Sequence, residues 1–174
     1  MKKKLYFAVV CVSTLFLESC SNIQVEPYSS AKADVFKMKN ILKNKLAVTG
    51  FSNKNMAESS IPCRVGAIQV SLPATETFSS YIENSFVEFL IDADKYDPGS
   101  KHALKGEIRK VDFDTITGNW HLTGDFMLNN KMVTIDKDYG FSSAFDDIPA
   151  CKNTAKAFNQ VVSKFVYDTL VSFK

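Results

Sequence analysis

Long apolar stretches are scarce in this 174-residue chain. The longest run of apolar or small residues covers residues 5–17, LYFAVVCVSTLFL. At 1.5 Å per residue, a helix of that length spans roughly 20 Å, which is short of the roughly 30 Å hydrocarbon core of a bilayer. A stable transmembrane helix is therefore the weaker interpretation of this run.

Basic clusters are equally scarce after the first four residues. Residues 1–19 hold three of the 21 basic residues and one of the 19 acidic residues, so the rest of the chain has 18 of each sign. A neutral chain without a long run of Lys or Arg offers little of the field that neutralises phosphates. We therefore expect no nucleic-acid partner.

Motifs of enzyme and cofactor sites are missing as well. The chain has no G-x-S-x-G sequence, no Gly-rich phosphate loop and no metal-binding spacing of cysteine and histidine. Its only histidines are His102 and His121, which make a thin ligand set for zinc. No metal and no cofactor are expected.

The amino-terminal segment has the marks of a secretory signal. Lys2, Lys3 and Lys4 precede the apolar run, and a small residue, Ser19, stands before a cysteine. The segment Leu17-Glu18-Ser19-Cys20 resembles the lipobox of bacterial lipoproteins, in which the cysteine receives a diacylglycerol and becomes the first residue after cleavage. Glu18 departs from that pattern, because its position is usually small and uncharged.

This resemblance implies a signal peptide at residues 1–19 and lipidation of Cys20. Ser21 follows the cysteine, which by resemblance to enteric sorting favours the outer membrane, with the domain facing the periplasm. Residues 21–32 are polar with no apolar period, so residues 20–44 are interpreted as the lipidated cysteine and a tether, with a short helix at residues 33–44.

Residues 45–174 are expected to form a single α+β domain. Apolar residues recur at helical spacing in residues 77–93 and again from residue 153 or 154 to residue 173. Strands are predicted at 45–51, 63–72, 103–114, 120–128 and 133–145, with a phase change that suggests a bulge after Ile108 and a hairpin turn at residues 129–131. The predicted order is β-β-α-β-β-β-α: an antiparallel sheet with two helices on one face.

Two cysteines remain in the domain once Cys11 leaves with the signal and Cys20 carries lipid. An oxidising periplasm and an even count favour a disulfide between Cys63 and Cys151, with two unpaired thiols as the alternative. Cys151 is expected just before the last helix. The bond closes a loop of 88 residues, and the chain-entropy model makes it worth roughly 4–5 kcal/mol.

One acid–base cluster is conceivable on the polar face of the 120–128 strand. His121 lies there, and Asp112, Asp114 and Asp125 are near it in sequence. The plainer interpretation is a solvated sheet face with ordinary charges. No catalytic residue is therefore assigned.

Several stretches of the domain resemble a known group of proteins. The most specific are KVDF at residues 110–113, GNW at 118–120, and the AC and TA.AF sequences at 150–151 and 154–158. Residues 45–173 resemble small, mostly uncharacterised lipoproteins of Gram-negative bacteria, whose domains are similar in shape to the auxiliary lipoproteins of envelope transport systems and to the lipopolysaccharide-assembly lipoprotein. The resemblance implies no catalytic residue, a binding or assembly role at the envelope, and a clasp formed by Cys63 and Cys151.

The expected function is thus a non-catalytic lipoprotein that is held to the membrane by its lipid and binds an envelope protein or a lipid-like partner. Binding is expected through the exposed sheet face or a strand edge. One alternative is a periplasmic enzyme that uses His121 with a nearby aspartate. The other is a surface-displayed factor that faces a host or a competitor.

Overall fold

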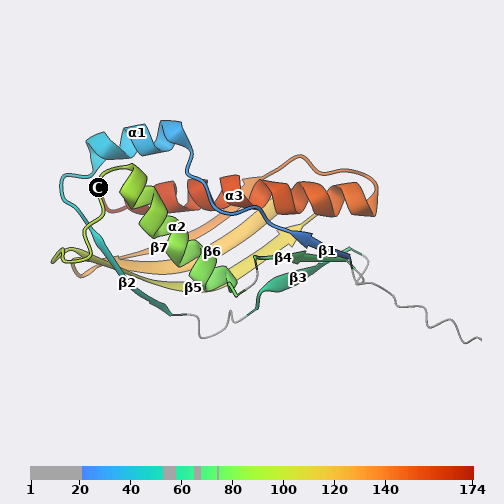
Figure 1. Ribbon diagram of the computed structural model, residues 1–174, viewed down its shortest axis with the longest axis horizontal. Helices are drawn as coiled ribbons and strands as arrows, with labels where there is room; N and C mark the ends of the chain where they lie inside the picture. The colour runs from blue at the N-terminus through green and yellow to red at the C-terminus, as the bar shows by residue number, and fades with distance from the viewer. Residues whose placement is uncertain (1–20, 53–57, 65–67, 74) are drawn as a thin grey trace, which may run out of the picture.

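The structure is a computed structural model that describes residues 21–52, 58–64, 68–73 and 75–174. Its class is α+β, as predicted, and it contains three helices and two mixed sheets in one domain (Figure 1). The elements in chain order are β1 (Ser21–Gln24), α1 (Lys32–Ile41), β2 (Ala47–Ser52), β3 (Ser60–Cys63), β4 (Ile68–Ser71), α2 (Phe78–Asp92), β5 (Ala103–Asp114), β6 (Asn119–Leu128), β7 (Lys131–Gly140) and α3 (Asp147–Val171).

The larger sheet has the strand order β2-β5-β6-β7. Strands β5, β6 and β7 pair antiparallel, and β6 alternates buried and half-buried residues along its whole length, as predicted. The turn between β6 and β7 consists of Asn129 and Asn130, both with positive φ, and Leu128 pairs with Lys131. Two residues with positive φ form the turn that matches the twist of a hairpin.

Strand β2 corrects the prediction of a wholly antiparallel sheet, because it pairs parallel to β5. The chain between these strands passes through β3, β4 and α2, and a long crossover of this kind returns a strand in the same direction. The predicted bulge in β5 is confirmed, since the register with β6 shifts between Ile108 and Lys110.

The smaller sheet has the order β1-β4-β3. The single strand predicted at residues 63–72 is wrong: β3 and β4 are two antiparallel strands, and Arg64 after β3 has a φ of 35°. An L-residue with positive φ interrupts extended backbone, so β3 ends there.

The predicted tether is wrong for residues 21–32. Strand β1 pairs parallel to β4, and the segment after it is bound to the helices. Val25 is buried, the hydroxyl of Tyr81 donates to the carbonyl of Glu26 at 3.0 Å, and the side chain of Asn159 donates to the carbonyl of Pro27 at 2.9 Å. Residues 21–44 therefore belong to the folded unit and are not a tether outside it.

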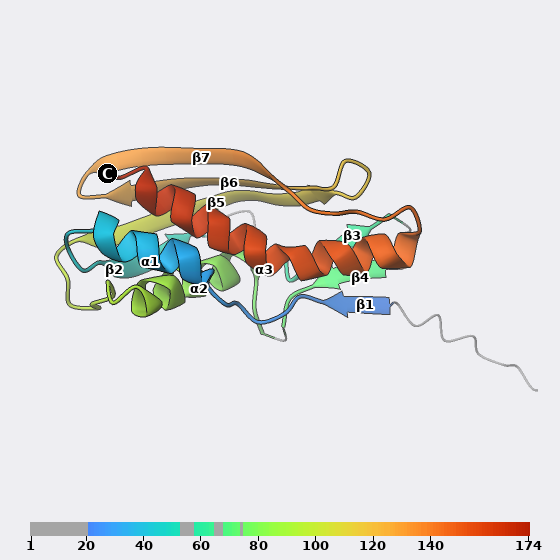
Figure 2. The same cartoon turned by 90° about the horizontal axis from the view of Figure 1, so that it is seen from above.

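Helices α2 and α3 cover one face of the larger sheet, and α1 packs against these two helices (Figures 1 and 2). Helix α2 matches its prediction. Thr77 caps its start, and the side chains of Thr77 and Ser80 each accept from the other's backbone N–H. Helix α3 begins at Asp147, earlier than predicted. Pro149 lies in its first turn, where a proline costs no helical hydrogen bond. The predicted helix at residues 33–44 exists as α1, and its Met38 is fully buried.

Aromatic rings fill the space between sheet and helices. Trp120 of β6 is fully buried, and its ring lies 4.5 Å from that of Phe158 on α3 and 4.8 Å from that of Phe113 on β5, measured between centroids. The core therefore joins β5, β6 and α3. The strand predicted to reach residue 145 ends at Gly140, and Phe145 is 97% exposed.

Candidate functional site

Cys63 and Cys151 form the predicted disulfide. Their sulfur atoms are 2.05 Å apart, their Cα atoms are 6.1 Å apart, and both residues are fully buried. Cys151 lies in the second turn of α3 and not before it, because the helix begins at Asp147. The bond therefore ties the end of β3 in the smaller sheet directly to the helix that covers the larger one.

Arg64 directly follows this bond and joins three segments of the chain. Its Nε donates to Thr115 Oγ1 at 2.8 Å, and its Nη2 donates to the carbonyls of Thr115 at 3.0 Å and Ala144 at 2.8 Å. Its Nη1 donates to the carbonyl of Phe145 and lies 3.5 Å from Asp147 Oδ1. A planar guanidinium with five donors suits such a junction. Periodicity gave no signal for this role, since a single arginine after a strand has no period.

His121 lies on the polar face of β6, as predicted, with carboxylates around it. Its Nδ1 is 2.7 Å from Asp138 Oδ1 and its Nε2 is 3.1 Å from Asp136 Oδ1. The Oγ1 of Thr123 is 3.3 Å from the same Nε2 and donates to Asp136 at 3.1 Å. The histidine is oriented by β7, but the hydroxyl that could act as its nucleophile is bonded to a carboxylate on an open sheet face.

The three aspartates predicted beside His121 have other roles. Asp125 accepts from Arg109 at 2.9 Å, and Asp114 accepts from the N–H of Ile116 at 2.7 Å. Asp112 pairs with His121 in the strand register, but its Oδ1 accepts from its neighbour Phe113. In the part of the chain that the structure describes, the imidazole forms its ion pairs with other carboxylates, those of Asp136 and Asp138. The partners are two residues of β7 that sequence proximity does not indicate.

The partners of His121 follow from the register of the β6–β7 hairpin. With Asn129 and Asn130 as the whole turn, each pair of partners is fixed by counting outward, and His121 faces Asp138. The three-residue turn that the sequence suggested gives a different register. The partner of His121 was therefore predictable only once the turn type was known.

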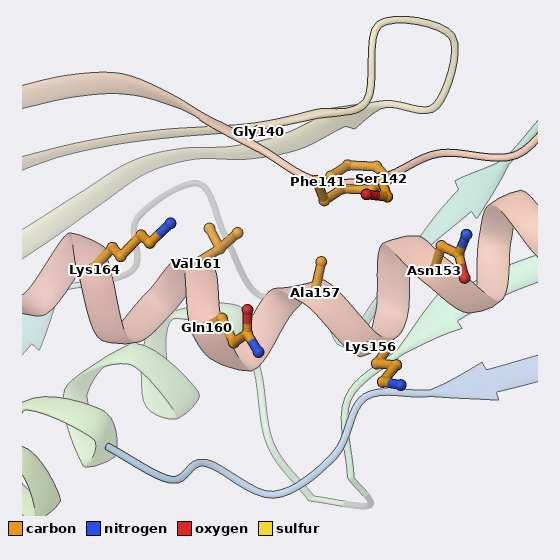
Figure 3. Close-up of a pocket in the computed structure, with 9 residues that line it drawn as sticks. All are labelled: Gly140, Phe141, Ser142, Asn153, Lys156, Ala157, Gln160, Val161 and Lys164. Atoms are coloured by element: carbon orange, nitrogen blue, oxygen red, sulfur yellow. The ribbon is translucent and has the colours of Figure 1, made fainter. Parts of the chain in front are cut away.

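A cavity of about 430 Å³ lies between α3 and the segment that follows β7 (Figure 3). Figure 3 shows Val161 and Ala157 on the side of α3 that faces Phe141, while Lys156 and Gln160 point to the other side. The cavity is also lined by Gly140, Ser142, Asn153 and Lys164. Because β7 is the outer strand of its sheet, an open strand edge borders this cavity.

Within the residues that the structure describes, no group of three or more His, Cys, Asp or Glu side chains could hold an ion. His102 directly precedes β5, and its Nδ1 lies 3.0 Å from Oδ1 of Asn129 in the turn between β6 and β7, at the opposite end of β6 from His121.

Comparison with known proteins finds similar folds among solved structures. No family model and no curated protein matches the sequence. The chain is similar to the crystal structure of protein XCC0632 from Xanthomonas campestris, of family DUF330, at 15% identity over 87% of this chain and 92% of that chain, with a TM-score of 0.48. It is also similar to the crystal structure of an uncharacterized protein at 7% identity over 88% of this chain and 100% of that chain, with a TM-score of 0.55. At 7% identity, this second likeness concerns the fold alone.

The predicted lipidation site, Cys20, and the predicted signal peptide at residues 1–19 lie outside the described residues. Within the described part, no helix is long and apolar enough to span a bilayer. Strand β1 starts at Ser21, the residue after that cysteine.

Proposed function

We propose that this chain is a lipid-anchored protein of a bacterial cell envelope, with a non-catalytic binding or assembly role at the periplasmic side of the outer membrane. The observation that carries the proposal is the division of its cysteines. Cys11 lies in a leader, Cys20 ends a lipobox-like segment, and Cys63 and Cys151 are bonded to each other. Disulfides persist in oxidising compartments such as the periplasm, to which such a leader directs a chain.

The proposed anchor acts on a domain without a long linker. Ser21 is covalently joined to Cys20 and already belongs to the smaller sheet through its pairing with Ile68. Lipid on Cys20 therefore holds the domain against the bilayer. A stable hold needs more than one acyl chain, because a single chain binds only marginally.

The cavity beside α3 is the proposed contact for a partner. An extended segment can pair with the free edge of β7 near Gly140 and place a side chain against Phe141 and Val161. Lys164 is exposed at this cavity, so a carboxylate on the partner is favoured there. We therefore propose an acidic, extended segment of an envelope protein as the ligand.

Mass spectrometry of the mature amino terminus tests the anchor. The expected product begins at Cys20 and carries diacylglycerol and an amide-linked acyl chain. A product that keeps residues 1–19, or one with an unmodified Cys20, contradicts the proposed function. Glu18→Gly is the matched variant, and its product should be the same with faster processing.

Photo-crosslinking in intact cells tests the binding site. A photoreactive residue in place of Asn153, which lines the cavity, should capture a specific envelope protein, and Lys164→Glu should reduce that capture. The same reactive residue at Lys105, on β5 of the same domain, is the control. Equal capture at both positions, or no capture at either, would contradict the cavity as the binding site.

Protease treatment of intact cells tests the location of the domain. A periplasmic domain is protected from the protease, whereas a surface-displayed domain is cleaved.

A further inference from the structure

Three large apolar side chains are exposed near the point where the chain enters the domain. Ile116, in the connection between β5 and β6, is 86% exposed, Phe145, before α3, is 97% exposed, and Ile148, in the first turn of α3, is 55% exposed. We call these three residues the apolar tip. The other large apolar side chains that are exposed in the described residues lie apart on α1, α2 and β7: Phe36, Ile91 and Met132.

The apolar tip is held in place by Arg64. The guanidinium binds the backbone on both sides, at Thr115 next to Ile116 and at Phe145 itself. Ile116 and Phe145 also line one cavity of about 850 Å³ with Arg64. Ordered backbone therefore presents these side chains to solvent, and their exposure is not the result of a loose loop.

The attachment point for lipid is at the same end. Ser21 pairs with Ile68, and Ile68 pairs with Cys63, the residue before Arg64. Two strand spacings place Ser21 roughly 10 Å from Cys63. Both views show the start of β1 and the start of α3 at one end of the elongated molecule, and the turn between β6 and β7 at the other (Figures 1 and 2).

Charge at this end does not favour an anionic surface. The guanidinium of Arg64 is occupied by its hydrogen bonds, and the three carboxylates of Asp114, Asp146 and Asp147 outnumber Lys152, the exposed lysine that follows Ile148 on α3. Attraction to acidic lipids requires free basic side chains, whereas apolar side chains enter the interface of a neutral bilayer as well.

We infer that the apolar tip is a membrane-contacting surface, with Ile116, Phe145 and Ile148 inserted among phospholipid head groups next to the lipidated Cys20. The inference rests on the proposed function, since the lipid brings this end to the bilayer. The domain then stands on its tip with α3 directed away from the membrane. The opposite end, with Met132, points into the aqueous space.

Quenching of tryptophan fluorescence by brominated phospholipids tests this orientation. The full mature lipoprotein is reconstituted in phosphatidylethanolamine vesicles with brominated acyl chains. Phe145→Trp is compared with Met132→Trp at the far end, and the buried Trp120 gives the same background in both. We expect at least a twofold greater quenching of the added tryptophan at 145. Ile116→Trp is the second probe, should Phe145→Trp lower the melting temperature.

Flotation of the same vesicles and the mass of the amino terminus separate the two ideas. A lipidated chain that floats with the vesicles but shows equal quenching at 145 and 132 overturns the membrane-contacting surface and leaves the anchor intact. A dimer in detergent, with position 145 shielded from lipid, also overturns the membrane-contacting surface, because the apolar tip would then contact a second copy of the chain. An unmodified Cys20 overturns both. Greater quenching at 145 that is unchanged by added phosphatidylglycerol supports the apolar contact.

Discussion

The indole Nε1 of Trp120 donates a hydrogen bond of 3.0 Å to the backbone carbonyl of Thr154. Both residues are fully buried, and the bond connects the start of β6 to α3 across the aromatic core. The sheet and the longest helix are thus joined by a directional contact as well as by apolar packing. A buried indole N–H has no water to replace that partner.

Trp120→Phe should lower the free energy of unfolding by about 2–4 kcal/mol. The change leaves the carbonyl of Thr154 with one donor fewer and removes part of a large buried ring. Urea unfolding followed by circular dichroism measures the loss. Met132→Ala on β7, whose side chain is 70% exposed, should stay within about 0.5 kcal/mol of the wild type. Equal effects of the two variants would contradict the packing described for β6.

Replacing both disulfide cysteines should cost roughly 4–5 kcal/mol of stability, because the bond closes a loop of 88 residues in the unfolded chain. Cys63→Ala with Cys151→Ala is compared with the wild type, oxidised and reduced. The reduced wild type should unfold near the double variant, and the oxidised wild type should move faster on a non-reducing gel. Free thiols on both cysteines in protein isolated from cells would refute the bond.

Asn159 on α3 fixes the segment that follows β1. Its Nδ2 donates to the carbonyl of Pro27 at 2.9 Å, and its Oδ1 accepts from the N–H of Ser29 at 3.0 Å. Asn159→Ala should cost about 1–3 kcal/mol, since two backbone groups lose their partner. Hydrogen exchange at Ser29 should also become faster. Gln160→Ala, an exposed neighbour, is the control, and identical exchange in both variants would mean that the segment is a tether after all.

The periodic elements were predictable because their burial follows from local spacing. Strand β6 buries alternate side chains, and helices α2 and α3 bury side chains at helical spacing, so each pattern can be recognised within one short stretch of sequence. The disulfide followed from a count of cysteines and the compartment that the leader implies.

Strand β1 left no such signal. It has four residues, and what secures it is non-local: its parallel pairing with β4 and the contacts of residues 25–31 with α2 and α3. The junction at Arg64 is equally non-local, since its partners at Thr115 and Ala144 are more than 50 residues away in the chain. Contacts at such separations have no period, so sequence patterns did not reveal the apolar tip.

His121→Ala should change stability by less than about 1 kcal/mol, because its two aspartate partners lie on an exposed sheet face. The variant also tests the catalytic alternative. A deletion strain that carries His121→Ala should behave as one that carries the wild type. Lys131→Ala on β7 is the control. Loss of complementation in a folded His121→Ala protein, but not in Lys131→Ala, would support the alternative of an enzyme that uses His121.

Asp114 makes the loop that carries Ile116 sensitive to acid. The N–H groups of Ile116 and Thr117 donate to its carboxylate, and these hydrogen bonds lower the pKa of Asp114. A folded-state pKa below the unfolded value means that the carboxylate contributes stability above the ordinary carboxyl pKa of about 3.9, and that the contribution disappears as the pH falls through the lower folded value.

We therefore expect the amide signals of Ile116 and Thr117 to be constant from neutral pH down to about pH 4 and to change together below it. Asp114→Asn cannot ionise, so its loop signals should be independent of pH over the same range. An unchanged titration in Asp114→Asn would assign the acid response to another group. Brominated-lipid quenching of Phe145→Trp should be the same at pH 5 and pH 7, because the carboxylate of Asp114 is ionised at both values.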